Sequence, residues 1–324
     1  MSFLVRRVLQ AAILLLVASV TVFAGVYAVG NPISLLVSPN APPDVVERTI
    51  RHLGLDRSLP EQYLIFLGNV LQGELGTSYV HAQPALELIG HRFPATLELV
   101  VAAMAIAVAV GLPLGMLAAR GRRSFLSAAI SNGSILGLSV PSFWIGLLLI
   151  IVFAITWRVF PTGGRGATVD VAGVPVSFLT ADGLAHLVLP ALTLSSFPMA
   201  ALVRLTESSI REVRGLDYVR FARALGLPPR EIARRYVLRN ILVPIVTVMG
   251  MMFGSLVAFS VVTETIFAWP GMGKLIMDSI RTSDRPVIVA YILFVVALFV
   301  TINALVDLVC ALIDPRLRVS RAAA

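Results

Sequence analysis

Few residues of this chain combine the type and the spacing that chemistry requires. The segment AWPGMGKL, residues 268–275, resembles a phosphate-binding loop, in which glycine amides, a lysine and a hydroxyl hold phosphate and Mg²⁺. The pattern fails at both ends, because Ala268 replaces the first glycine and Leu275 replaces the serine or threonine. We therefore predict a bent loop here and no nucleotide site.

The residues that most often ligate metals or act as bases are scattered. His52, His81, His91 and His186 lack the spacing of metal ligands, and no Gly-x-Ser-x-Gly elbow presents a nucleophilic serine. Cys310 is the single cysteine, so the chain can form no internal disulfide. We expect a chain that binds no cofactor of its own and is not an enzyme.

Two acids, Glu264 and Asp307, lie within long apolar stretches. An ionisable residue at membrane depth is a functional candidate by default. The competing interpretation is an ion pair with a nearby arginine, or a position close to the membrane interface.

The segment YVRFARALGLPPREIARRYVLRN, residues 218–240, carries six arginines between two apolar stretches. Tyr218, Phe221, Ala222 and Leu225 have the i, i+3, i+4, i+7 spacing of an amphipathic helix. Gly226 can end that helix with a positive φ, which glycine adopts at little cost.

The residues after Gly226 predict a turn and a second helix. Leu227, Pro228 and Pro229 cannot continue the first helix, because proline lacks the amide hydrogen and clashes with the preceding turn. Pro229 suits the first turn of a new helix, which we expect to run from Arg230 toward Asn240. The segment is thus predicted to form a helix, a tight turn and a helix.

The elements that position this segment are apolar. The chain has 324 residues, of which 57% are hydrophobic and 14% charged, against about 45–50% and about 25% in soluble domains. Six runs reach the roughly 20 apolar residues of a spanning helix: 8–29, 94–119, 125–157, 184–206, 241–267 and 287–313. We expect an all-α integral membrane protein of six helices, with breaks or kinks at Pro113, Pro141, Pro190, Pro198 and Pro244.

Arginine asymmetry predicts the orientation. With both termini in the cytoplasm, 17 of the 26 basic residues lie inside. The net charge of +8 does not favour nucleic acid as a partner, because the arginines adjoin apolar spans. Outside, residues 45–55 have helical periodicity, and the Gly- and Pro-rich residues 160–183 predict an irregular loop or a short hairpin.

Two interpretations of the arginine-rich segment remain. The arginines can fix topology and contact anionic membrane lipid. Alternatively, the short helix can insert into a groove on a cytosolic partner. The sharp turn at Gly226 and Pro228 favours the second interpretation, because lipid contact requires no turn.

The stretch DYVRFARALGLPPREIARRYVLRN resembles the cytoplasmic EAA loop of bacterial ABC-importer permeases, in the form found in the dipeptide and oligopeptide branch. Arg220 stands where the family has its leading glutamate, and Arg239 where many members have proline. The resemblance extends along nearly the whole chain, through LGLDRSLPEQYLIFLGNVLQGELGTS, HRFPATLELVVAAM, LSVPSFWIGLLLI, TETIFAWPGMGKLI and DPRLR. Asn31 replaces an aspartate that the branch often has after its first span.

The resemblance implies a permease subunit of the dipeptide-permease B type, with the type I importer fold, in a bacterial inner membrane. Its partners would be a second homologous permease, two cytosolic ATPases that bind ATP and Mg²⁺, an external solute-binding protein and a peptide substrate. The coupling loop would comprise residues 207–240 and contact the ATPases through Tyr218, Phe221, Ala222, Leu225, Gly226, Leu227, Pro228 and Arg230. Glu264 and Asp307 are then candidates for the translocation path.

The implied domains are residues 1–93, with the first span and an external segment; the transmembrane domain, 94–313; and a cytoplasmic tail, 314–324. Within the same family the cargo could instead be nickel, glutathione, an oligosaccharide or another small solute. Rivals from other classes are an ion-coupled secondary transporter, which would show inverted repeats and midplane charges, and an intramembrane hydrolase.

Overall fold

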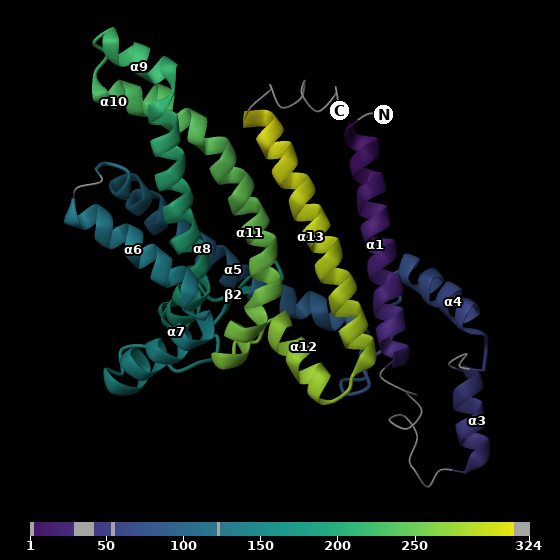
Figure 1. Cartoon of the computed structure of the whole chain (residues 1–324). Helices are drawn as coiled ribbons and strands as arrows, with labels where there is room; N and C mark the ends of the chain where they lie inside the picture. Colours follow the sequence, from purple (N-terminus) through teal and green to yellow (C-terminus); the bar gives the residue numbers. More distant parts are fainter. Residues whose placement is uncertain (1–2, 29–41, 53–55, 122–123, 314–324) are drawn as a thin grey trace. The chain divides into compact units, whose positions relative to one another are not determined.

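The computed structural model describes residues 3–28, 42–52, 56–121 and 124–313. The expected tail, 314–324, and Asn31 with its neighbours Gly30 and Pro32 lie outside the described residues. Almost every described element is a helix, as predicted (Figure 1). In chain order they are α1 Phe3–Ala28, α3 Pro43–His52, α4 Leu59–Leu71, α5 Ala85–Ala118, α6 Phe125–Ser139, α7 Ser142–Leu149, the π-helix η1 Ile150–Thr156, β1 Val169–Val171, β2 Val174–Val176, α8 Ala181–Gly215, α9 Asp217–Ala224, α10 Pro229–Glu231, the π-helix η2 Ile232–Leu238, α11 Arg239–Ile266, α12 Met272–Arg281 and α13 Arg285–Ile313.

Four helical stretches among the described residues are long and apolar enough to cross a membrane. They are Ala85–Ala118, Ala181–Gly215, Pro229–Ile266 and Arg285–Cys310. A fifth is counted if α6 and the α7–η1 helix, which meet at an angle of 103°, form one broken span. The predicted first span falls on α1, which contains the shorter apolar helical stretch Leu9–Gly25.

The prolines act differently along the chain. Pro141 separates α6 from α7, and the expected break is confirmed there. Pro113 lies inside α5, Pro190 and Pro198 inside α8, and Pro244 inside α11, and each of these helices continues as one element. Pro141 is the N-cap residue of α7, where an amide hydrogen would have no partner within the helix.

Contacts group the described residues into two units. Unit 1 lies within Met1–Phe93 and Leu275–Val300, and unit 2 within Pro94–Lys274 and Thr301–Ala324. Helices α5, α12 and α13 therefore contribute residues to both units.

In unit 1, helix α1 packs against α13 and α4. Val22 of α1 forms a buried cluster with Val289 and Leu293 of α13, and the Ser19 and Tyr63 hydroxyls are 2.9 Å apart. The loop before α5 is held by the buried Asp284, which accepts hydrogen bonds from the Ser78 hydroxyl (2.5 Å) and the Tyr79 amide (3.0 Å). Burial also raises the pKa of the Tyr79 phenol above its usual value.

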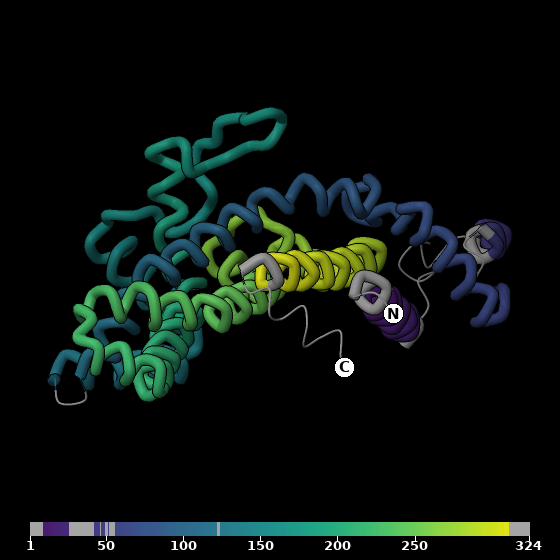
Figure 2. Tube along the Cα trace, turned by 90° about the horizontal axis from the view of Figure 1, so that it is seen from above, coloured from purple at the N-terminus to yellow at the C-terminus, as the bar shows by residue number. Residues whose placement is uncertain are grey.

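In unit 2, helix α8 is central, and α5, α6, α7 and α11 all contact it. The approach of α5 depends on glycine. A Cβ added at Gly115 would lie 2.6 Å from the Thr206 Cβ and 2.7 Å from the Val203 carbonyl oxygen of α8. Small residues let helix backbones approach closely in membranes, where packing rather than the hydrophobic effect drives association. Of the two forms predicted for the loop before α8, an irregular loop or a short hairpin, the structure shows a hairpin, in which β1 and β2 pair antiparallel with Val169 opposite Val176. Figure 2 shows the hairpin extending clear of the helices of unit 2.

We predict that Gly115→Ala loosens unit 2. Because the added methyl group would overlap the backbone of α8, we expect a loss of stability of about 1–3 kcal/mol, the usual cost of overpacking. Thermal unfolding of the purified protein in detergent measures it. The control is Gly133→Ala in α6, where a Cβ meets nothing within 4 Å. Equal melting temperatures for the two variants would contradict the close contact of α5 and α8.

Candidate functional site: a helix-turn-helix at one end of unit 2

Helices α9 and α10 lie at the shared end of α8 and α11 (Figure 1). α9 begins directly after α8, because Leu216 adopts extended backbone angles (φ −74°, ψ 148°) and separates the two helices. The next turn leads into α10, η2 and α11 in an unbroken run. The predicted order of helix, turn and helix is therefore confirmed. The second helix does not stop near Asn240, however, because Pro229–Ile266 is continuous and 38 residues long.

The turn after α9 is a Schellman motif. The Gly226 amide donates to the Arg223 carbonyl (3.0 Å), and the Leu227 amide donates to the Ala222 carbonyl (3.2 Å). Gly226 has φ +76°, as predicted, and a Cβ added there would meet nothing within 4 Å. Glycine is therefore required by backbone conformation and not by lack of space.

The two prolines then start the next helix. Pro228 occupies the N-cap position with extended angles, and its carbonyl accepts from the amides of Glu231 (2.9 Å) and Ile232 (3.1 Å). Pro229 is the first helical residue, where its missing amide hydrogen is not needed.

One face of this segment packs onto the bundle. Val219 and Ala222 of α9 are 0% and 2% exposed, and they join a cluster with Ile232 and Val237 of η2. Ile210 and Val213 at the end of α8 belong to the same cluster, and Leu227 packs against it half-buried. The turn is thereby attached to the spanning helices by apolar contacts on both of its sides.

The opposite face of α9 is apolar but exposed. Tyr218, Phe221 and Leu225, the exposed strip, are 40%, 65% and 64% exposed. The sequence placed Ala222 on the same face as these three, whereas the structure turns Ala222 inward beside Val219. The i, i+3, i+4, i+7 pattern covers a wide arc, and the burial of Val219 decides which edge of that arc faces the bundle. Pro228 and Arg230 are also exposed.

Polar contacts support the base of the segment. The Arg214 guanidinium of α8 donates to the Ala119 carbonyl (2.8 Å), just after the end of α5. The Ser127 hydroxyl of α6 donates to the neighbouring Ala118 carbonyl (2.5 Å). These side chains satisfy carbonyls that have no helical partner at the end of α5. Three helices are thus joined where α9 begins.

The structure places the two acidic candidates differently. Glu264 is fully buried in α11, and its carboxylate accepts hydrogen bonds from the hydroxyls of Thr96 (2.7 Å) and Ser260 (3.0 Å) and from the Lys274 amide (3.0 Å). Asp307 is half-buried in α13. A role for either in the translocation path stays a prediction.

The carboxylate of Glu264 also explains the glycines of the segment that resembles a phosphate-binding loop. A Cβ added at Gly271 or Gly273 would clash with that carboxylate or with the backbone beside it. The Met272 amide, between the two glycines, donates to the Thr96 hydroxyl (2.8 Å). The glycines therefore allow the loop to close over Glu264.

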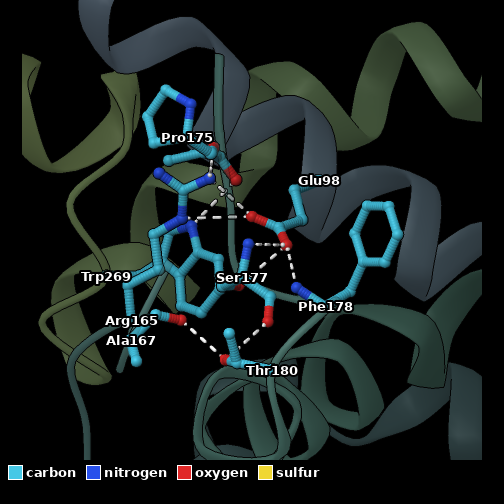
Figure 3. Close-up of polar contacts among 9 residues, drawn as sticks. Glu98, Arg165, Ala167, Pro175, Ser177, Phe178, Thr180 and Trp269 are labelled. Atoms are coloured by element: carbon cyan, nitrogen blue, oxygen red, sulfur yellow. Dashed lines mark hydrogen bonds and ion pairs between the residues drawn. The ribbon is translucent and has the colours of Figure 1, made fainter. Parts of the chain in front are cut away.

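A buried ion pair in unit 2 was not predicted from the sequence. The Glu98 carboxylate of α5 accepts hydrogen bonds from the Arg165 guanidinium, the closest at 2.6 Å, and these two side chains are 5% and 10% exposed (Figure 3). Its other oxygen accepts from the Ser177 amide (2.8 Å), the Ser177 hydroxyl (2.7 Å) and the Phe178 amide (2.8 Å). Arg165 also donates to the Pro175 carbonyl (2.7 Å) and lies 5.8 Å from the Trp269 ring centre. One carboxylate thus holds both ends of the loop that carries the β1–β2 hairpin.

Long apolar helices, with a helix-turn-helix at one end of unit 2, indicate a membrane protein. Among solved structures, a chain of the MetNI methionine ABC transporter in an inward-facing conformation has this fold. Its TM-score is 0.53 at 17% identity, covering 70% of this chain and 96% of that one.

The sequence family agrees with the fold. Residues 111–319 match the family of binding-protein-dependent transport system inner membrane components, and residues 1–100 match the N-terminal model of such components. The chain belongs to this family. It is 37% identical to the dipeptide transport system permease protein DppB of Escherichia coli K12, over 91% of this chain and 92% of that protein. It is also 37% identical to the oligopeptide transport system permease protein AppB of Bacillus subtilis, over 98% and 99%.

We predict that Gly226→Ala disturbs the turn through its backbone alone. A residue with a Cβ pays about 1–2 kcal/mol in the left-handed region, so we expect faster hydrogen exchange at the Gly226 and Leu227 amides. Gly226→Asn should be milder, because asparagine tolerates this region. The control is Gly215→Ala, where the methyl group meets nothing within 4 Å and φ is not in the left-handed region. Identical exchange in the alanine variants would refute the requirement.

We predict that Glu98→Gln releases the hairpin loop. It leaves the Arg165 guanidinium buried without its counter-charge, a defect that costs roughly 3–5 kcal/mol. Hydrogen exchange across residues 163–180 should accelerate much more than exchange in α11. Glu87→Gln is the matched control, since its carboxylate is 57% exposed and pairs with the exposed His91 at 3.6 Å. Unchanged exchange in Glu98→Gln would show that the ion pair does not hold the loop.

Proposed function

We propose that this chain is the permease subunit of an ATP-driven importer for dipeptides or oligopeptides. The observation that carries the proposal is the exposed strip of Tyr218, Phe221 and Leu225 on a helix whose other face is packed onto the bundle. An apolar helix face that is held rigidly and exposed on a short loop suits insertion into a groove of another protein. Membership of the family supplies the class of transport system.

The partners follow from the family. Two cytosolic ATPases bind and hydrolyse ATP with Mg²⁺, a second homologous permease completes the path, and an external binding protein delivers the solute. The peptide cargo is proposed because the relatives that match along nearly the whole chain are named as dipeptide and oligopeptide permeases. This chain catalyses no reaction itself.

The proposed topology has six spans in a bacterial inner membrane, with both termini and the α9–α10 segment in the cytoplasm. Residues 1–93 comprise the first span, which is α1, and an external segment. Residues 94–313 form the transmembrane domain. Residues 207–240 are the coupling loop, and they contact the ATPases through the exposed strip, Gly226, Leu227, Pro228 and Arg230. Ala222, on the inner face of α9, supports this contact by packing α9 against the apolar cluster of the bundle.

Coupling in this proposal is mechanical. Closure of the ATPases moves α9, and the apolar cluster around Val219 and Ala222 transmits that movement to the ends of α8 and α11. Because η2 and α11 form one continuous helix with α10, the turn and the spanning helix move together.

We predict that a cysteine at Leu225 forms a disulfide with an ATPase. In a Cys310→Ala background, Leu225→Cys is co-expressed with candidate ATPases that carry a cysteine in their helical-domain groove. Because Leu225 is 64% exposed, a cross-link should form, and its yield should vary with ATP.

The matched control is Val219→Cys on the same helix, whose side chain is 0% exposed and packs into this chain's own cluster. It should cross-link much less. If the Leu225→Cys thiol instead reacts freely with a water-soluble reagent while the ATPases are bound, the exposed strip is not the contact. The coupling assignment would then be wrong.

A further inference from the structure

A polar hollow between α6 and α8 is not explained by the proposed contact of the exposed strip with the ATPases. Its volume is about 250 Å³. Four of its residues, at i, i+3, i+4 and i+7, share one face of α8, and two more, at i and i+4, share one face of α6. The lining residues are Ser131, Ile135, Arg204, Glu207, Ser208 and Arg211.

The charges of the hollow are unequal. The buried Glu207 carboxylate accepts hydrogen bonds from the Ser131 hydroxyl (2.9 Å) and pairs with Arg211 (2.5 Å). Arg204 is exposed, and among the described residues it has no hydrogen bond or ion pair. Two guanidinium groups therefore face one carboxylate, and the surplus positive charge belongs to Arg204.

Beyond Arg204 the groove becomes apolar. Helices α6 and α8 run antiparallel. Ser131 of α6 contacts Glu207 of α8, whereas a Cβ at Gly137, six residues later on α6, would lie 3.1 Å from the Ala200 Cβ, seven residues earlier on α8. Phe197 lies seven residues before Arg204, on the same face of α8, and it is 55% exposed. Ile135 on the α6 wall is 47% exposed. A cationic end thus continues into an exposed apolar wall.

We propose that this hollow binds the headgroup of an anionic phospholipid. Arg204 faces the phosphate, for which a guanidinium offers two parallel hydrogen bonds, and the acyl chains cover Ile135 and Phe197. The leaflet follows from the topology under Proposed function, which places Arg204 at the cytoplasmic side, where anionic lipids attract basic groups. A small soluble anion would match the charge but would leave the apolar wall exposed.

The test counts retained lipid by native mass spectrometry. The full chain alone and the assembled transporter are each released from bilayers that contain phosphatidylglycerol and phosphatidylcholine. Arg204→Gln should lower retained phosphatidylglycerol about fivefold, the loss expected for one basic contact. Arg204→Lys should keep most of it.

Two further variants separate the alternatives. Arg239→Gln removes another exposed arginine near the same end of the bundle, and it should retain lipid as the wild type does. Phe197→Ala should lower retention about threefold, because it removes apolar contact with the acyl chains. Added glycerol phosphate should not displace the lipid.

Four results would overturn the proposal. Equal losses in Arg204→Gln and Arg239→Gln would indicate general charge attraction, and no loss in Arg204→Gln would exclude the hollow. Displacement by glycerol phosphate, with no effect of Phe197→Ala, would indicate a site for a free anion. Lipid on the chain alone but not in the assembled transporter would show that another subunit covers the groove. Failure of the ATPase cross-link would contradict the proposed function, but it would leave lipid retention by the chain alone unchanged. The two proposals can therefore fail independently.

Discussion

Where an apolar helix ends, its last carbonyls and first amides lose their partners within the helix. In surroundings without water, each such group must find another partner or cost several kcal/mol. The end of α5, the end of α9 and the start of α12 show three solutions to this requirement. At the end of α5, side chains of α6 and α8 donate to the Ala118 and Ala119 carbonyls. At the end of α9, the amides of the turn at Gly226 donate back to carbonyls of α9. At the start of α12, the Glu264 carboxylate accepts a hydrogen bond from the Lys274 amide.

The buried acids serve this constraint. Glu98, Glu264 and Asp284 each accept at least one backbone amide from a loop that lies far away in the sequence or beyond the next turn. A carboxylate can take several hydrogen bonds at once, which makes it an efficient anchor for irregular backbone. These three acids therefore hold backbone in place, and beside Glu264 the glycines Gly271 and Gly273 provide the space.

Local features of the chain were predictable from the sequence, and distant ones were not. The turn at Gly226 and the start at Pro229 follow from residues within six positions, so their conformations could be read directly. The orientation of α9 required the positions of Ile210 and Val237, which periodicity does not supply. The pair of Glu98 and Arg165 spans 67 residues with no repeating pattern between them. The available signals were a lone acid in an apolar helix and a lone arginine in a glycine-rich loop. Neither signal predicts that the two residues form a pair. The continuity of α10 with α11 was missed because proline and arginine residues suggested a boundary.

The attachment of the hairpin loop has a mechanical consequence. Both ends of the loop are held by the Glu98 carboxylate, and the strands β1 and β2 extend beyond this point. The loop is therefore an arm that is fixed at its root, Glu98, and free at its tip. A sideways push on the tip is converted into a torque at the root. Because that root is a side chain of α5, the torque acts on a spanning helix, whereas an unanchored loop would simply bend.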